Sequence, residues 1–430
     1  MNIGKWNKKD VIVWDVTSYY SYLPALFYEN DLTLSFCNNH PEYTENNRMY
    51  NPIKLLNGNR VIKTTMGMAV MYLPFFSLAH IYCKITGITS DGFSEPYQCA
   101  IQFSGLFYLL LGLFFLRKIL ISWAGEKVAA WTLLFIVFGT NLFLYGSIQG
   151  AMAHAAGFAL VTIMIYLFMK WMENPQIKHS ILLGVVCGLM VLIRPVNILC
   201  LLFPLLFGLK GISELWERLK FLLSNYLQIQ IIVVVAFLVN LPQLVYWKII
   251  TGHFLFNSYV GERFYFSNPH LIEGLFGFRK GWLVYSPIMI FSLIGIMFLK
   301  KYAQAFSSII LLLVPIYIYV VLSWWCWWYG GSFGLRAMID IYPFLAISLA
   351  ALVLVLHTGT MMGKKLLLSI MCILVVLNLW QTTQYRWGII HHDGMTKEAY
   401  FDAFFRIEKS PEQEKFIKIP DYEKARLGKE

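Results

Sequence analysis

One carboxylate stands alone among aromatic residues near the start of the sequence, in the segment VWDVTSYYSYLPA at residues 13–25. If this segment is helical, Tyr19 and Tyr22 follow Asp15 at i+4 and i+7 and lie on the same face. A carboxylate beside apolar rings at a membrane is poorly hydrated, which suits it to take a proton as a general base. The alternative is structural, because an Asp at this point could cap the start of the helix.

Two cations beside apolar runs could bind an anionic ligand. Lys63 opens VIKTTMGMAVMYLPFF. A lysine there can meet a lipid phosphate, or it can keep its carbon chain in lipid and its ammonium in water. Arg194 is the only charge in GLMVLIRPVNILCLLF. Such a charge costs several kcal/mol unless it is paired or hydrated, so Arg194 either lines a polar cavity or has a structural partner.

Three more cations lie near aromatic and glycine-rich segments. Arg279 and Lys280 are adjacent in GFRKGWLVYSP, and Arg336 follows WWCWWYGGSFGL. Arg279 and Lys280 either orient the chain in the membrane or bind an anion. Arg336 either pairs with Asp340 on a helix or reaches into a binding site. One carboxylate with several cations at a membrane surface suits a reaction whose leaving group is a lipid phosphate.

The remaining candidates are weaker. His154 follows the turn GSIQGAMAH and is either a packing residue of an apolar helix or part of a pocket. Glu262 either pairs with the adjacent Arg263 or lines the same pocket. The segment 391–393, His-His-Asp, resembles metal ligands only superficially, because the sequence shows no third partner. We therefore predict no metal site, and we find no nucleotide-binding loop, zinc-protease motif or nucleophile elbow in a supporting context.

The composition indicates a membrane protein. The chain has 430 residues, of which 58% are hydrophobic and 14% are charged, whereas soluble proteins have about 25% charged residues. The apolar runs are long and do not alternate with polar residues, so the membrane spans are predicted to be helices. The net charge of +11 comes mostly from basic residues between apolar runs, which indicates orientation in a membrane rather than binding of nucleic acid.

Ten apolar segments are predicted to span the bilayer. They are residues 99–116, 128–148, 152–170, 181–193, 196–209, 229–250, 281–299, 306–323, 340–357 and 366–382. An eleventh run, 66–83, is interrupted by Pro74 and His80 and is predicted to lie in the membrane interface.

Every second loop is basic, and basic loops face the cytoplasm. This places 1–98 outside as a long first loop with juxtamembrane helices, followed by a transmembrane bundle at 99–382. The tail at 383–430 also lies outside.

Five segments together resemble the GT-C glycosyltransferases, which are multi-pass membrane enzymes that use polyprenyl-phosphate sugars. The resemblance is to the protein O-mannosyltransferase and lipid A aminoarabinose transferase branch, in a bacterial group described as family-39-like. The segments are WDVTSYYSYLPALFYENDLT, VIKTTMGMAVMYLPFFSLAHIY, LIRPVNILCLLFPLL, GLFGFRKGWLVYSPIM and WWYGGSFGLRAMIDIYPFL.

The resemblance implies a role for most of the candidate residues. Asp15 matches the catalytic base in the first extracytoplasmic loop, and Lys63 matches a lysine that contacts the lipid phosphate. Arg194, Arg279, Lys280 and Arg336 match by context as donor-binding residues.

The resemblance also implies a helix before the acidic loop, which is expected to be missing here because only 14 residues precede Asp15. Relatives carry Met-Ser-His and an aromatic where this chain has AMAHAAGF, so the pocket near His154 is expected to differ.

The expected function is sugar transfer, with inversion, from a polyprenyl-phosphate donor to an extracytoplasmic hydroxyl. The acceptor is an unknown glycan, lipid or protein, and the site faces the periplasm from the bacterial cytoplasmic membrane. No cofactor is fixed, because the family has members with and without a divalent metal. A transporter is the main alternative, since a helix broken at Arg194-Pro195 is also a transporter feature. A truncated, non-catalytic relative is the third possibility.

Overall fold

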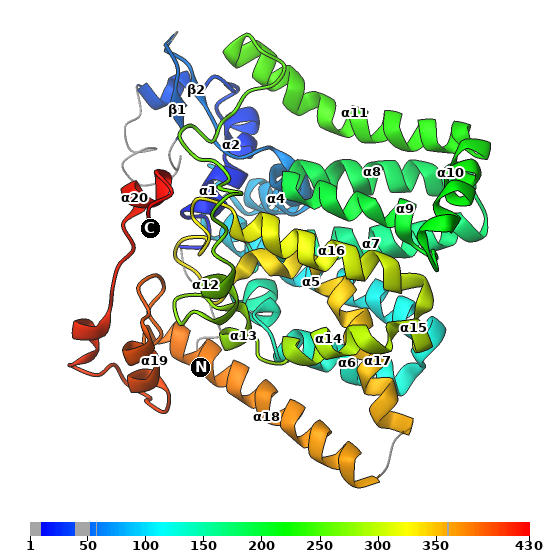
Figure 1. Cartoon of the computed structure of the whole chain (residues 1–430). Coiled ribbons are helices and arrows are strands. Elements are labelled where there is room, and N and C mark those ends of the chain that lie inside the picture. Colours follow the sequence, from blue (N-terminus) through cyan, green and yellow to red (C-terminus); the bar gives the residue numbers. More distant parts are fainter. Residues whose placement is uncertain (1–9, 39–51, 57, 359–360) are drawn as a thin grey trace. The chain divides into compact units, whose positions relative to one another are not determined.

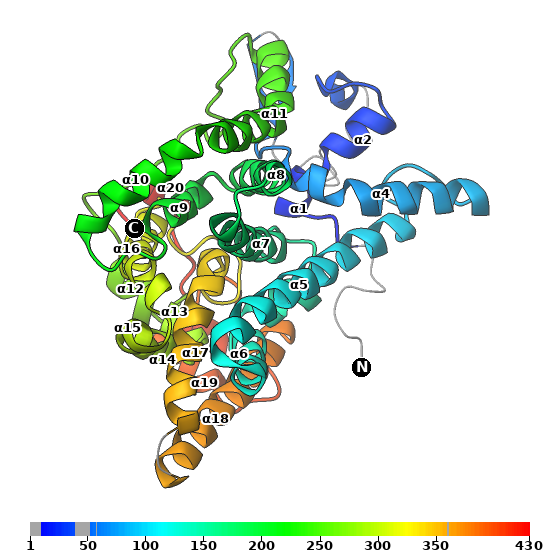
Figure 2. The ribbon, with the colours of Figure 1, turned by 90° about the vertical axis from the view of Figure 1, so that its right-hand side faces the viewer.

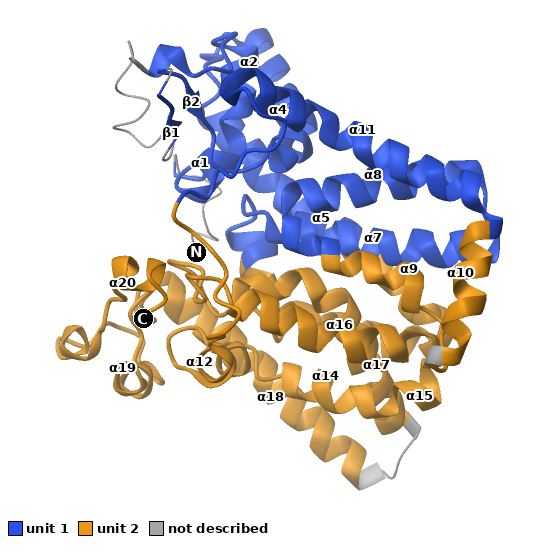
Figure 3. Ribbon diagram, turned by 45° about the horizontal axis from the view of Figure 1, so that its top comes forward, with its two compact units in different colours: residues 1–112, 145–198, 224–260 blue, residues 113–144, 199–223, 261–430 orange. Residues whose placement is uncertain are grey.

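The computed structural model describes residues 10–38, 52–56, 58–358 and 361–430, so residues 1–9 and 39–51 of the predicted first loop lie outside the described residues. In the described part, the secondary structure is helical except for one antiparallel pair of short strands, β1 (Ile53–Lys54) and β2 (Arg60–Val61). The chain forms two compact units (Figure 3). Unit 1 holds 1–112, 145–198 and 224–260, and unit 2 holds 113–144, 199–223 and 261–430.

Seven helices of the described chain are long and apolar enough to span a bilayer, so the protein is an all-α membrane protein. They are α4 (Gly67–Thr86), α5 (Glu95–Ala124), α7 (His154–Glu173), α11 (Tyr226–Thr251), α16 (Gln304–Leu322), η6 with α17 (Arg336–Ile341 and Tyr342–Thr358) and α18 (Met361–Arg386). The predicted count of about ten spans stays a prediction.

Four of the ten predicted spans, 128–148, 181–193, 196–209 and 281–299, are shorter or interrupted. Segment 128–148 is α6 (Glu126–Phe138) and then an irregular stretch with the π-helix η2 (Leu144–Ile148). Pro195 separates α8 (Ile177–Ile193) from η3 (Pro195–Leu202) and α9 (Phe203–Leu206). Pro287 likewise separates α13 (Trp282–Tyr285) from α14 (Met289–Gly295), because proline removes a backbone donor and clashes with the preceding turn.

The shorter elements lie between these helices and in the tail. They are α1 (Asp15–Tyr20), α2 (Tyr22–Phe27), η1 (Ser35–Asn38), η4 (Ile212–Glu214), α10 (Leu215–Ser224), α12 (Leu271–Phe276), α13 (Trp282–Tyr285), α14 (Met289–Gly295), η5 (Ile296–Phe298), α15 (Leu299–Tyr302), α19 (Lys397–Ala403), η7 (Gln413–Phe416) and α20 (Tyr422–Arg426).

In unit 1, α8 lies between α7 and α11 (Figure 2). The close approach of α11 depends on Gly184, where an added Cβ would lie 2.6 Å from the Val235 Cβ. Helix α4 runs across the direction of α7 and α8, as Figures 1 and 2 both show. A crosswise helix is what an interfacial segment would form, although α4 is also long and apolar enough to cross. Its placement in the interface therefore stays a prediction.

In unit 2, α17 is the buried centre and packs on α6 and α14. Helix α14 comes so close to α17 that a Cβ at Gly295 would lie 2.0 Å from the Ser348 carbonyl oxygen. The tail of unit 2 holds α19, η7 and α20. The two units group the chain by contacts, so the predicted division by membrane side at 1–98, 99–382 and 383–430 stays a prediction.

Candidate functional site

Asp15 is the first residue of α1. The capping position before it is Trp14, whose side chain makes no cap hydrogen bond. Trp14 has a φ of 52° and a ψ of −129°, a conformation that is strained for a bulky side chain. The structure therefore places Asp15 inside the helix rather than at its cap, next to a strained backbone.

The two faces of α1 differ in burial. Tyr20 is fully buried, its hydroxyl donates to the Gly92 carbonyl, and its ring lies 6.4 Å from the ring of Tyr72. Asp15 and Tyr19 are only partly buried, so they share the more open face of the helix, as predicted from their spacing. Tyr22 differs from the prediction, because α1 ends at Tyr20 and Tyr22 begins the buried part of α2.

The segment that carries Lys63 is fixed to α1 and α2 on one side. The Ser18 and Thr64 hydroxyl oxygens are 3.1 Å apart, and the Tyr22 hydroxyl donates to the Thr64 carbonyl over 2.7 Å. The Lys63 ammonium lies 5.1 Å from the centre of the Tyr259 ring, within the range of a cation–π contact. Asp15 and Lys63 therefore stand on segments that directly contact each other.

The same segment is fixed to α8 and α11 on its other side. The Thr65 hydroxyl donates to the Leu192 carbonyl over 2.5 Å, and the Gln243 side-chain oxygen accepts from the Met66 amide over 2.8 Å. Leu192 is two residues before Arg194, so these contacts also relate the lysine segment to the end of α8.

Arg194 lies at the end of α8 rather than within it. Its backbone is extended, and one guanidinium nitrogen lies 3.3 Å from Nδ1 of His154. Because a guanidinium only donates, Nδ1 of His154 accepts and the ring proton sits on Nε2. His154 is buried at the first residue of α7, and the Tyr145 ring packs edge-on at 5.0 Å. The two residues form one polar cluster, with Nε2 of His154 as a donor.

Two residues outside the predicted set hold the turn before His154. The Gln102 amide donates to the carbonyls of Ser147 and Ile148 over 2.8 and 3.1 Å, and the Tyr72 hydroxyl donates to the carbonyl of Ala151. The π-helix η2 leaves carbonyls without their usual helical partners, and short π-helical segments are frequent at functional sites. The one signal for Gln102 in the sequence is that it is a polar residue in an apolar span.

In unit 2, Arg279 is held by both charge and aromatic contacts. Its Nη1 lies 3.3 Å from the Glu430 Oε1, and both side chains are largely buried. Its guanidinium carbon is 5.3 Å from the centre of the Trp328 ring. This pairing joins the loop before α13 to the end of the described chain.

Lys280 is buried, with 1% of its surface exposed. Its ammonium donates to the carbonyls of Ser332 and His392, so it joins two loops that are far apart in sequence. Burial lowers the pKa of Lys280 to about 7, with smaller effects from the positive charges of Arg336 and Arg279 and an opposing effect from Asp393. This geometry gives Lys280 a structural role, and its predicted contact with a lipid phosphate stays a prediction.

The other residues of unit 2 surround these loops. Arg336 is the first residue of η6, and its positive charge favours the thiolate of the buried Cys326, although burial dominates and raises the pKa of that thiol to about 12. Glu262 is partly buried in the loop before α12. The Tyr422 hydroxyl donates to the Asp393 carboxylate over 2.7 Å, which fixes α20 to the loop before α19. The predicted roles of Arg336 and Glu262 stay predictions.

Within the described ranges, no three His, Cys, Asp or Glu side chains gather as metal ligands. His391 and His392 stack at 4.3 Å instead, and Nδ1 of His391 accepts from the amides of Asp393 and Gly394. The metal question that the resemblance raised therefore stays open.

Comparisons with protein-family models, curated proteins and solved structures give no match to this chain. Unit 1 contains Asp15, Tyr19, Lys63, His154 and Arg194, and unit 2 contains Glu262, Arg279, Lys280 and Arg336. A single site containing all nine residues stays a prediction.

Proposed function

We propose that the protein is a membrane glycosyltransferase that moves a sugar from a polyprenyl-phosphate donor to an acceptor hydroxyl. The observation that carries the proposal is the Asp15 segment. A partly buried carboxylate stands beside a strained residue, on a helix fixed to the segment of Lys63. Strained backbone positions cluster at active sites, and a general base must be held within reach of the proton that it takes. A transferase of this kind also needs a lipid boundary, and the apolar helices supply one.

The proposed reaction is a single displacement. Asp15 takes the proton of the acceptor hydroxyl while the hydroxyl oxygen attacks the anomeric carbon of the sugar. The bond between that carbon and the phosphate oxygen breaks, and polyprenyl phosphate leaves with the electron pair. Attack opposite the leaving group inverts the anomeric centre. Lys63 and Arg194 stabilise the negative charge on the departing phosphate.

The finer features of the proposal follow the family resemblance. The fold would be a GT-C bundle with the site on the periplasmic face of a bacterial cytoplasmic membrane. The first loop would carry interfacial helices, and the crosswise α4 supports this part. The acceptor would be a glycan, lipid or protein hydroxyl. If the reaction uses a divalent metal, treatment with a chelator should abolish sugar transfer.

The experiment that tests the function supplies purified protein in lipid nanodiscs with polyprenyl-phosphate sugars and a crude acceptor fraction. We expect transferred sugar and free polyprenyl phosphate to appear in equal amounts. Release of the lipid without transfer would indicate hydrolysis and contradict the proposal.

The break at Arg194-Pro195 favours a transporter as the second candidate. Solute uptake by proteoliposomes, with no lipid product, would support that candidate, and neither activity would indicate a non-catalytic relative.

We further expect His154 and Arg194 to act as one unit. His154→Ala and Arg194→Gln should each lower kcat/KM about tenfold or more, because a hydrogen bond to a charged group contributes about 1.5–3 kcal/mol. The double variant should be little worse than either single variant, because each change removes the same contact. Initial rates at varied donor concentration measure these effects. His179→Ala, which changes a partly buried histidine on α8, is the control. Multiplicative losses in the double variant would show that His154 and Arg194 act independently.

A further inference from the structure

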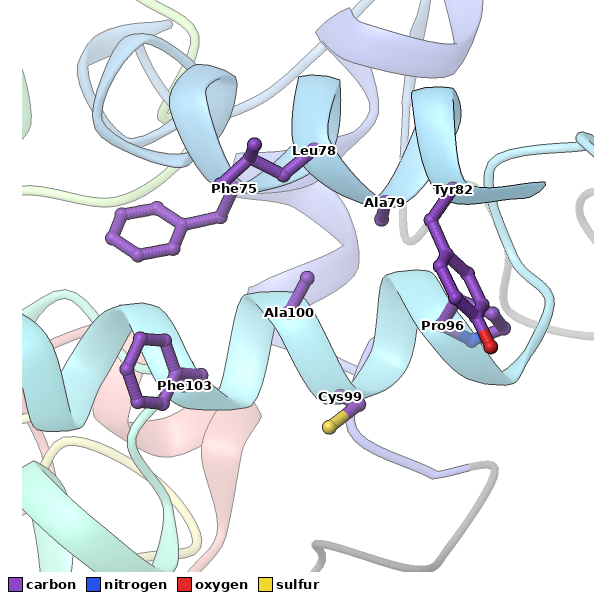
Figure 4. Close-up of a pocket in the computed structure, with 8 residues that line it drawn as sticks. All are labelled: Phe75, Leu78, Ala79, Tyr82, Pro96, Cys99, Ala100 and Phe103. Carbon is purple, nitrogen blue, oxygen red and sulfur yellow. The ribbon is translucent and has the colours of Figure 1, made fainter. Parts of the chain in front are cut away.

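Unit 1 contains an apolar groove between α4 and the first half of α5 (Figure 4). Its volume is about 340 Å³. The walls are aliphatic and aromatic, and the only polar side-chain atoms are the Tyr82 hydroxyl and the Cys99 thiol. The lining residues are Phe75, Leu78, Ala79, Tyr82, Pro96, Cys99, Ala100 and Phe103. A groove of this composition offers an anion or a sugar almost no hydrogen-bond partner, so its ligand must be a hydrocarbon.

The groove is continuous with the apolar surface that the two helices expose. On α4, Val70, Leu78, Tyr82 and Ile85 are exposed along one stripe at helical spacing. On α5, Phe103, Phe107 and Leu110 form a second exposed stripe. Leu78, Tyr82 and Phe103 belong to both a stripe and the groove wall. In a membrane protein, exposed apolar stripes face lipid, so the groove opens toward the hydrocarbon of the bilayer.

The other end of α4 leads to the candidate site. Lys63 stands four residues before Gly67, the first residue of the helix. The groove residues Phe75 to Tyr82 lie about 12–22 Å along α4 from that start, at 1.5 Å per residue. Tyr72 lies between the two regions and packs against Tyr20 of α1. Helix α4 therefore links Lys63, which is expected to bind the phosphate, with a groove that suits only a hydrocarbon.

We propose that this groove binds the hydrocarbon tail of the polyprenyl-phosphate donor while the head group lies near Lys63. The inference rests on the proposed function, because that function supplies a ligand with an anionic head and a long apolar tail. A tail seated between α4 and α5 would set the position of the phosphate along α4. It would also favour long prenyl chains over short ones, since a short chain cannot reach the groove from Lys63.

The first test uses Cys99, which lines the groove and is the exposed member of the seven cysteines, all of which lie in the described chain. Protein in detergent is treated with a membrane-permeant maleimide, and the adduct at Cys99 is followed by mass spectrometry. A long-chain polyprenyl phosphate at about ten times its Kd should slow the reaction about tenfold. Geranyl phosphate, with the same head group on a short tail, should not protect. Equal protection by phosphatidylcholine would assign the groove to bulk lipid and overturn the proposal.

The second test fills the groove. Ala100→Trp should raise KM for the lipid donor about tenfold, with kcat changed less than about twofold, because binding of the tail is the same in the ground and transition states. Leu110→Trp, on the exposed stripe of α5 outside the groove, is the matched control. Ala100→Leu repeats the test with a smaller change if the tryptophan variant does not fold.

The outcomes separate this inference from the proposed function. Transfer by the native protein, with no protection of Cys99 and an unchanged KM in both Ala100 variants, would overturn the groove proposal and leave the transferase standing. Protection of Cys99 by the long-chain lipid, with no transfer from any sugar donor, would support the groove and count against the transferase.

Discussion

Replacing Asp15 with Asn should lower kcat for sugar transfer by about 10²–10⁴-fold, the contribution of a positioned general base. The substitution keeps the size of the side chain and removes only its ability to take a proton. Binding of the lipid donor should be almost unchanged, because the proposed contacts of the phosphate come from cations. Initial rates at varied donor and acceptor concentrations give kcat and KM separately, and thermal unfolding shows whether the variant keeps its stability.

Two matched variants serve as controls for Asp15→Asn. Asp10→Asn changes an exposed acid five residues earlier, and it should leave the rate unchanged. Asp31→Asn changes an acid that is structural, because Asp31 accepts hydrogen bonds from Thr33 and Ser35. Partial burial of Asp31 opposes its charge, but these hydrogen bonds prevail and lower the pKa of its carboxyl group. Asp31→Asn should therefore reduce stability and not kcat. Equal rates for native protein and Asp15→Asn would leave the transferase class standing and remove Asp15 as its base.

Local patterns in the sequence predicted what depends on local residues. Helical, lipid-embedded architecture follows from long apolar runs, and the shared face of Asp15 and Tyr19 follows from their i, i+4 spacing. The break at Pro195 was predictable because proline lacks the amide that a helix needs. Arg194 could be singled out because a lone charge in an apolar run requires a partner, and the structure supplies His154.

Other features depend on residues that are far apart in sequence. The segment before His154 is held by Gln102, which bonds two carbonyls of η2, and by Tyr72, which bonds the Ala151 carbonyl. Bonds to backbone carbonyls cannot be recognised from the composition of that segment. Lys280 shows the same limit more strongly. Its sequence setting, a cation beside Arg279 at a membrane boundary, is typical of an anion site, yet its partners are the carbonyls of Ser332 and His392. Carbonyl partners cannot be predicted from side-chain types.

The burial of Lys280 has a measurable consequence for stability. Its pKa is lowered by burial to about 7, below the ordinary value of 10.5. Between these two pH values the unfolded chain binds more protons than the folded chain, so stability must rise with pH in that window. The contribution is full above about pH 10.5, is lost as pH falls to about 7, and changes no further below that. The slope should approach about 1.4 kcal/mol per pH unit in the middle of the window.

Lys280→Met isolates this contribution, because it keeps the side-chain volume and removes the titrating amine. The difference in unfolding free energy between native protein and variant should grow in favour of native protein as pH rises from 7 to 10. Taking the difference cancels the titration of groups near Lys280, which include Asp393, Arg336, Arg279 and Cys326.

Lys300→Met, at an exposed lysine of the same unit, should show no such trend. A difference that does not depend on pH would mean that Lys280 is hydrated and charged in the folded protein. Its ammonium would then be accessible to an anion, as the sequence alone had suggested. The pH dependence of this one variant therefore decides between a lysine that holds two loops together and a lysine that holds a phosphate.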